Sequence, residues 1–187
     1  MAGRSVTGTL VLLIFLLVRP PLADEVELSA KQGIARYEKL VRNQPRKAPY
    51  QNALGYYYLK AGNFQEAETH FLEAIQLDDS YATAHNNLGA LYLRQQRPKQ
   101  AEYQFRQALK LNPHYGKAQY NLAVALFRQK RYGKAAQAYL KARELDSDYV
   151  ERRDNREKLK QALEQVAQDD TPTQELRRMK QWFAPSY

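Results

Sequence analysis

Cysteine is absent from the 187-residue sequence, and its absence removes several classes of function. A chain without cysteine forms no disulfide, holds no zinc through thiolates and has no cysteine nucleophile. It also has no N-terminal cysteine for lipid attachment. A cysteine-free chain suits any redox compartment, so the compartment must be argued from other residues.

Histidine is scarce, and nothing around the three histidines points to chemistry. His70, His85 and His114 lie apart in the sequence, with no carboxylate cluster or glycine-rich phosphate loop beside them. His85 is the kind of lone histidine that usually packs or forms a hydrogen bond. We therefore expect no enzyme, no metal site and no cofactor.

The N-terminal apolar run is short. Residues 10–18 are all apolar, which is about half of the ~20 residues that a helix needs to cross a bilayer. Arg4 gives a basic start, prolines follow the run, and Ala23 offers a small residue for peptidase cleavage. We interpret residues 1–23 as a signal peptide and expect export, with the bacterial periplasm as the compartment.

Pro21 keeps a second interpretation open. It stands three residues before the cut, where a small residue is preferred. In this alternative the segment stays uncleaved, and residues 10–18 anchor the chain to the inner membrane.

The sequence repeats itself with a period of 34. Residues 48–81, 82–115 and 116–149 align without an insertion or deletion. Apolar residues within each repeat fall at helical spacing in two stretches joined by a turn, so each repeat is predicted to be a helical hairpin. Five columns carry the pattern: Leu54, Leu88 and Leu122; Gly55, Gly89 and Ala123; Ala67, Ala101 and Ala135; Phe71, Phe105 and Tyr139; Ala74, Ala108 and Ala142.

These columns resemble the tetratricopeptide-repeat (TPR) family. The family pattern has leucine-glycine in the first helix, then alanine, an aromatic residue and alanine in the second, and Pro113 matches its proline between repeats. The column of Gln51, His85 and Gln119 departs from it, because the family often has tryptophan there. The resemblance implies an all-α fold, a right-handed superhelical solenoid of helix-turn-helix hairpins that binds proteins or peptides without catalysis.

The flanks are expected to close the two ends of the solenoid. Within residues 24–47, the stretch 29–43 is predicted to be a single packing helix, because Gly33 and Tyr37 are in register with the second half of a repeat. Residues 150–168 are predicted to form a C-terminal capping helix. Residues 169–187 are predicted to form a tail with a short amphipathic helix.

The resemblance also implies a binding groove lined by the first helices. Lys60, Arg94 and Arg128 share one column, so we hypothesise that they face an acidic segment of a partner; the alternative is that they only interact with helix dipoles. A clamp for a terminal carboxylate is matched in part only, by Asn87 and Lys117. The predicted groove residues are Asn52, Tyr56, Lys60, Asn86, Asn87, Arg94, Lys117, Tyr120, Asn121, Phe127 and Arg128.

The formal net charge of +9 leaves two rivals to a soluble peptide-binding scaffold. A nucleic-acid binder fits the basic balance but not an exported chain, and acidic residues interrupt the basic stripe. A membrane-anchored scaffold would hold its partner at an anionic membrane surface. For the leading interpretation, analogy with exported repeat proteins suggests assistance to envelope assembly or secretion.

Overall fold

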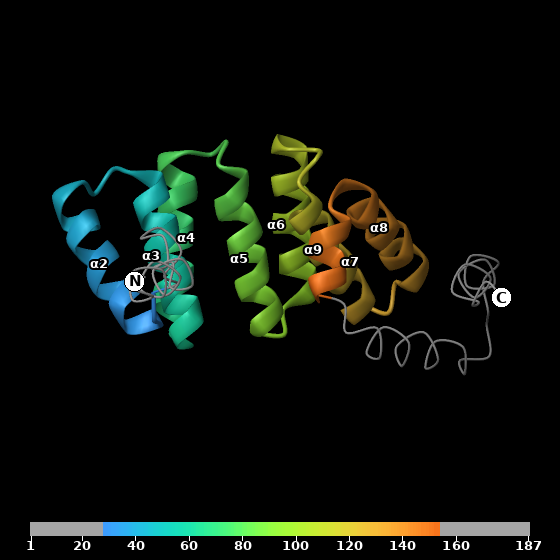
Figure 1. Ribbon diagram of the computed structural model, residues 1–187, viewed down its shortest axis with the longest axis horizontal. Helices are drawn as coiled ribbons and strands as arrows, with labels where there is room; N and C mark the ends of the chain where they lie inside the picture. The colour runs from blue at the N-terminus through green and yellow to red at the C-terminus, as the bar shows by residue number, and fades with distance from the viewer. Residues whose placement is uncertain (1–27, 154–187) are drawn as a thin grey trace, which may run out of the picture.

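The computed structural model describes residues 28–153, and within them the chain is helical (Figure 1). A preceding helix, three helical hairpins and a short final helix follow one another. Their bounds are α2 Ala30–Asn43, α3 Ala48–Ala61, α4 Phe64–Leu77, α5 Ala82–Arg94, α6 Pro98–Leu111, α7 Gly116–Arg128, α8 Tyr132–Leu145 and α9 Ser147–Arg153.

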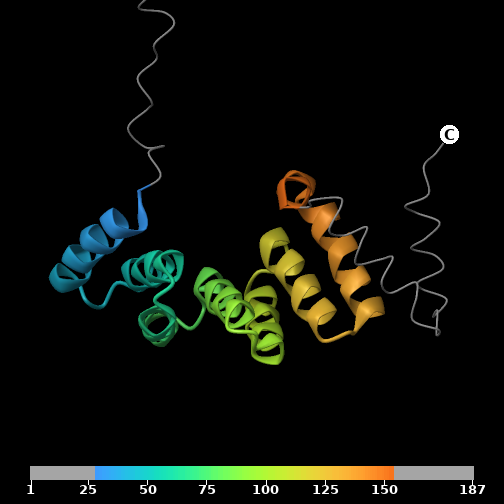
Figure 2. The same cartoon turned by 90° about the horizontal axis from the view of Figure 1, so that it is seen from below.

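The hairpins stack into an arch. α3 packs against α4, α5 against α6, and α7 against α8, while α3 also contacts α5 and α5 contacts α7. Figure 2 shows the first helices α3, α5 and α7 on the inner side of the arch and α4, α6 and α8 on the outer side. We call the side formed by α3, α5 and α7 the inner face. This is the predicted all-α solenoid of helix-turn-helix hairpins.

In each of the first two hairpins, a phenylalanine ring packs against a glycine at the centre of the hairpin. Phe71 and Phe105 have no exposed surface. A Cβ added to Gly55 would lie 2.8 Å from the Phe71 ring, and one added to Gly89 would lie 2.5 Å from the Phe105 ring. The glycine column therefore lets the two helices of a hairpin approach closely enough for the ring to fill the space between them.

The turn inside each hairpin contains one residue in the left-handed conformation. Gly62, Gln96 and Lys130 occupy the same position of the repeat and have φ of 87°, 58° and 60°. Only the first of them is glycine, the residue that adopts this conformation without steric cost.

Replacing Gln96 with glycine is therefore expected to stabilise the protein. The left-handed conformation costs a residue with a side chain roughly 1–2 kcal/mol, and the greater freedom of glycine in the unfolded chain offsets part of that gain. We expect the free energy of unfolding to rise by about 0.5–1 kcal/mol, measured by urea denaturation. Gln96→Ala should give no such gain; if it matches Gln96→Gly, the backbone explanation is wrong.

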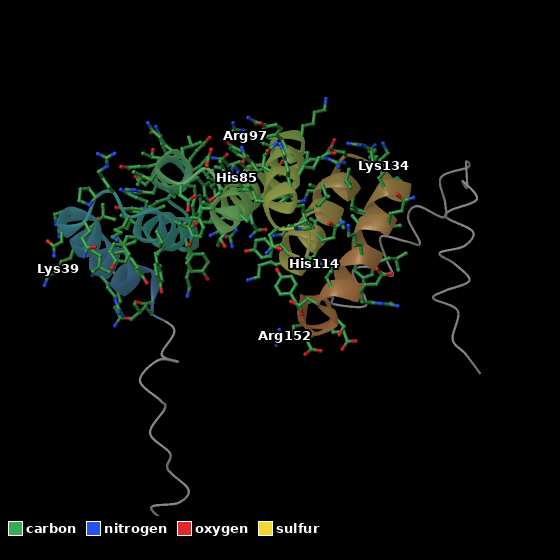
Figure 3. The ribbon with its side chains drawn as sticks, turned by 90° about the horizontal axis from the view of Figure 1, so that it is seen from above. Lys39, His85, Arg97, His114, Lys134 and Arg152 are labelled. Carbon is green, nitrogen blue, oxygen red and sulfur yellow. The ribbon has the colours of Figure 1, made fainter. Side chains whose placement is uncertain are left out.

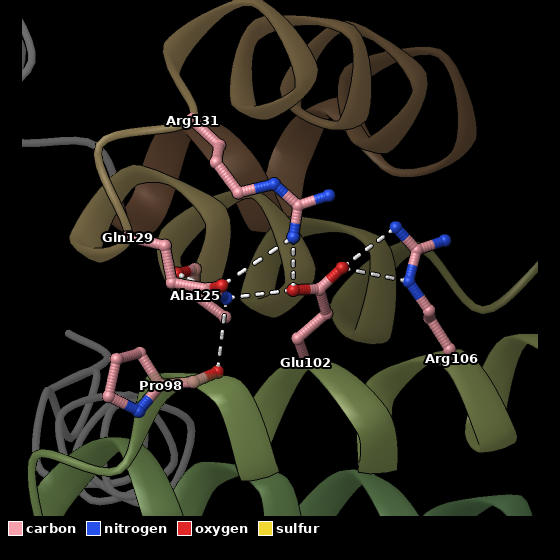
Figure 4. A network of polar contacts seen from close by, with 6 residues as sticks. All are labelled: Pro98, Glu102, Arg106, Ala125, Gln129 and Arg131. Atoms are coloured by element: carbon pink, nitrogen blue, oxygen red, sulfur yellow. Dashed lines mark hydrogen bonds and ion pairs between the residues drawn. The ribbon is translucent and has the colours of Figure 1, made fainter.

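Repeated polar contacts join neighbouring hairpins on the outer side. Arg131 Nη1 donates to Glu102 Oε2 at 2.6 Å, and Gln129 Nε2 donates to the same oxygen at 2.8 Å (Figure 4). Arg106 donates twice to the other oxygen of Glu102, at 2.9 and 3.0 Å. One repeat earlier, Arg97 makes the corresponding contact to Glu68 at 3.4 Å. The same ion pair thus links the first hairpin to the second and the second to the third.

The environment of Glu102 favours its charged form. Burial alone would raise the pKa of this carboxyl group, but the hydrogen bonds from Gln129 and Arg106 and the charge of Arg131 together lower it. A lowered pKa means that the contact stabilises the fold at pH values above the usual carboxyl range and that this stabilisation is lost as the pH falls through the folded-state pKa.

The ends of the described chain differ from the hairpins between them. Ser29 caps α2 through a capping box with Gln32. α9 begins at Ser147, directly after α8, and the Asp146 carboxylate caps it by accepting the backbone N–H of Tyr149 at 2.9 Å. The predicted signal segment, the capping helix beyond residue 153 and the tail lie outside the described residues. No helix within residues 28–153 has the length and apolar character needed to span a membrane.

Candidate protein-binding face

The inner face carries positive charge without any acidic residue of its own. α3, α5 and α7 contain no aspartate or glutamate. They contain Lys60, Arg94, Lys117 and Arg128, all exposed to solvent. The acidic residues of the first hairpin lie on α4 and in the turn after it. The fold therefore separates the charges of the sequence and leaves a cationic inner layer.

The predicted cation column lies at the C-terminal ends of the first helices. Lys60, Arg94 and Arg128 each stand in the last turn of their helix. Arg128 Nη1 donates to the carbonyl of Leu93, at the end of α5, at 2.6 Å, and Lys60 Nζ donates to the carbonyl of Leu28 at 3.4 Å. Lys60 and Arg128 thus cap backbone carbonyls, as in the alternative interpretation. Arg94 and Arg128 form no ion pair with a carboxylate of residues 28–153.

Four asparagines connect the three first helices. Asn121 donates to Asn86 at 2.9 Å, Asn86 donates to Asn87 at 3.4 Å, and Asn87 donates to Asn52 at 2.9 Å. Asn52 and Asn86 are buried, with 7 % and 2 % of their surface exposed, whereas Asn87 and Asn121 are half-buried. Of the four predicted groove asparagines, the structure therefore leaves only Asn87 and Asn121 able to meet a partner.

Aromatic residues close the C-terminal end of the inner face. The Tyr120 ring lies edge-on to the Tyr149 ring, with centroids 5.7 Å apart, and 6.4 Å from the Tyr139 ring. Lys117 Nζ lies 5.3 Å from the centroid of the Tyr149 ring, a cation–π contact. Tyr149 is buried, so its ring packs under the face and positions Lys117 and Tyr120.

The remaining predicted residues lie at the two ends of the face. Tyr56, on α3, is 43 % exposed and packs edge-on against Tyr57 at 5.4 Å. Phe127, on α7, is half-buried against Tyr132 at 5.3 Å. Tyr56 therefore offers the larger apolar surface to a partner.

Two histidines join the helices within a hairpin. The His70 ring is hydrogen-bonded to Gln51, and the His85 ring to Gln104, each at 2.8 Å. Gln51 and His85 occupy one position of the repeat, and His70 and Gln104 occupy another. The first two hairpins therefore contain the same histidine–glutamine pair, with the two residues in exchanged positions. Burial lowers the pKa of His70, although Glu73, Glu38 and Glu66 oppose the shift. Within residues 28–153 no group of three potential metal ligands lies together. The pairs occupy the place where the family often has tryptophan, and the structure assigns them a packing role.

The sequence did not indicate which side chains would be in contact between the helices. Burial raises the pKa of Tyr81, and a hydrogen bond with Asn52 opposes this shift. Burial, together with a hydrogen bond to Glu68, raises the pKa of Tyr92 to about 12. The one signal that could have predicted such contacts was a sequence separation that recurs from repeat to repeat. The asparagine bonds between helices join residues 35 apart, and the ion pairs between hairpins join residues 29 apart.

Comparisons with known proteins agree with this architecture. Models of the tetratricopeptide repeat match residues 46–114 and 86–150. No curated protein sequence gives a significant match. Among solved structures, MamA is 20 % identical, with a TM-score of 0.58 over 65 % of this chain and 71 % of that chain.

Two further structures are domains of Spaghetti (RPAP3) bound to the HSP90 peptide SRMEEVD. The first domain is 23 % identical, with a TM-score of 0.58 over 65 % of this chain and 94 % of that one. The second is 24 % identical, with a TM-score of 0.52 over 58 % and 98 %. Identities this low establish the fold alone. The in-phase repeats, the helical hairpins and the two matching models show that this chain belongs to the tetratricopeptide-repeat family.

Proposed function

We propose that this chain is a non-catalytic scaffold that binds an acidic segment of a partner protein on its inner face. The observation that carries the proposal is the charge separation: three stacked first helices hold four cations and no acid. Arg94 and Arg128 form no ion pair with any carboxylate of residues 28–153. An acidic segment laid along α3, α5 and α7 would meet these charges in succession.

Half-buried polar groups on the same face suit an extended backbone. Asn87 and Asn121 are held in place by their bonds to Asn52 and Asn86. An amide that is already positioned loses little side-chain entropy when it meets a peptide. The similar domains of Spaghetti (RPAP3) bind a peptide, SRMEEVD, that contains three acidic residues, which supports the same class of ligand here.

An array of heptapeptides with net charges from about −3 to +3 tests the proposal. Binding to the full chain should strengthen with negative charge. The Lys60→Gln, Arg94→Gln, Arg128→Gln variant should weaken binding of the acidic peptides by roughly 10-fold or more, because glutamine retains a donor but removes the charge.

The matched control removes three exposed cations from the outer helices. The Lys99→Gln, Lys110→Gln, Lys134→Gln variant changes the net charge equally and should bind acidic peptides as the wild type does. Binding without charge dependence, or equal weakening in both variants, would refute recognition by the inner face.

The compartment is part of the same proposal. Residues 1–23 direct export to the bacterial periplasm, where the scaffold would assist an envelope assembly or secretion process; the basic start, short apolar run and small residue at Ala23 support this. The mass of the chain recovered from the envelope fraction tests it. A mass beginning at Asp24 supports cleavage, whereas an intact N-terminus favours anchoring by residues 10–18.

A membrane-anchored scaffold is the second candidate, and one observation favours it. The first described helix, α2, carries basic residues on its exposed surface and follows the N-terminal apolar run in the sequence. In this form the chain would hold its partner next to an anionic membrane.

A further inference from the structure

The outer surface of α2 has a single sign of charge. Lys31, Arg36, Lys39 and Arg42 are all exposed. At 100° per residue they fall within an arc of about 140°. The opposite side of the helix is used for packing: Gly33 is buried, and the Tyr37 ring stacks on Tyr57 of α3 with centroids 5.5 Å apart. We call the exposed surface of Lys31, Arg36, Lys39 and Arg42 the basic face of α2.

The charges of this face are uncompensated. Glu38, the one acid of α2, accepts the hydrogen bond of the Tyr58 hydroxyl at 2.8 Å. None of the four cations pairs with a carboxylate of residues 28–153. Arg46 and Lys47, also exposed, extend the positive surface into the turn before α3. Figure 3 shows Lys39 projecting from the α2 end of the molecule, away from the other helices.

The chemistry of the basic face fits lipid headgroups better than a protein. A specific protein interface needs a buried apolar or aromatic centre. Between the four cations, α2 exposes only Gln32, Ala35 and Asn43, so such a centre is missing. A layer of anionic headgroups requires only exposed cations, and clusters of four to eight of them on a helix are sufficient for attraction.

The place of α2 in the sequence indicates the same partner. Eleven residues, 19–29, separate the end of the apolar run, Val18, from the start of α2, Ala30. A chain of this length spans at most about 40 Å. An apolar run held in a bilayer would therefore keep the basic face within reach of the headgroups.

We propose that the basic face of α2 docks on the surface of an anionic phospholipid bilayer. This deepens the second candidate function, because it names the surface that would contact the membrane. It does not depend on the inner face, which lies on other helices. Peptide binding and lipid docking are thus tested separately.

Partitioning of the full chain between buffer and vesicles tests the proposal, without any peptide partner. Vesicles of phosphatidylcholine with about 30 % phosphatidylglycerol are compared with pure phosphatidylcholine at ~0.1 M salt. The wild type should prefer the anionic vesicles. The Lys31→Gln, Arg36→Gln, Lys39→Gln, Arg42→Gln variant should lose roughly 100-fold of this preference.

A second variant keeps the net charge matched. Lys99, Lys110, Lys134 and Lys141, exposed on α6 and α8, are replaced by glutamine, and this variant should retain the wild-type preference. All three chains keep residues 1–27, so insertion of the apolar run, and repulsion by Asp24, Glu25 and Glu27, cancel in the comparison. Helical content measured by circular dichroism confirms that each variant is folded.

Three results would overturn the proposal. The first is a wild type without preference for the anionic vesicles, and the second is equal loss in both variants, which would indicate net charge rather than this face. The third is binding of a polyglutamate peptide that depends on the four α2 cations, without vesicle preference, which would assign the face to an acidic protein.

Discussion

Replacing Phe105 with alanine is expected to lower the free energy of unfolding by about 3–5 kcal/mol. Its side chain has no exposed surface, and its ring fills the space above Gly89 between α5 and α6. α5 also packs against α4 and α6 against α7, so we expect these contacts to oppose a movement of α5 and α6 into the cavity. The second hairpin packs between the first and the third. Destabilising it should therefore also weaken its packing against both neighbouring hairpins.

Tyr103→Ala is the matched control for this change. Tyr103 is an aromatic residue on the same helix, but it is 60 % exposed. Its replacement should change stability by about 0.5 kcal/mol or less. Urea denaturation followed by circular dichroism measures both variants. A Phe105→Ala variant that unfolds at the same urea concentration as Tyr103→Ala would show that the ring is not the centre of the core.

The core was predictable from the sequence because of its period. Leucine, glycine and alanine columns recur every 34 residues, and a column has one environment when identical hairpins stack. The aromatic column of this pattern accordingly contributes Phe71 and Phe105 to the core, both without exposed surface. The third member of that column, Tyr139, is half-buried; within residues 28–153 its hairpin is the last of the stack and is followed by the short α9.

The candidate site was predictable only in part. Asn52 and Asn86 were assigned to the groove by their column, but their side chains face the next first helix and bond to its asparagines. A column fixes the side of the helix and not the rotamer, and a short amide close to a neighbouring helix satisfies its hydrogen bonds there. Arg94, at the end of α5, has a long side chain that is exposed to solvent, so it stays a candidate for contact with a partner.

The ion pairs between hairpins were missed for a related reason. Glu68 and Glu102 lie in one column, and Arg97 and Arg131 lie in another. The repeated offset of 29 residues was present in the sequence, but it did not predict a contact. The contact forms because stacking places the turn of one hairpin against the second helix of the preceding hairpin. Periodicity therefore predicts which residues share an environment, while the structure shows which environments touch.

Replacing Gly33 with alanine is expected to separate α2 from the hairpins. In an exposed helix this change is stabilising by about 0.5–1 kcal/mol, because alanine has the higher helix propensity. Here an added Cβ would lie 2.1 Å from a ring carbon of Tyr57, so the sign should reverse. Overpacking of this kind typically costs about 1–3 kcal/mol. Hydrogen exchange should show the loss of protection in α2, with the hairpin of α5 and α6 unchanged.

A second substitution in Tyr57 identifies the cause. If the clash is with this ring, Tyr57→Ala will destabilise the docking of α2 by itself, since the ring also stacks on Tyr37. Adding Gly33→Ala to Tyr57→Ala should then cost nothing further and should recover some helix propensity, which makes the two changes strongly non-additive. Additive losses would mean that Gly33 is required for another reason, and that α2 is not held by the stack of Tyr37 on Tyr57.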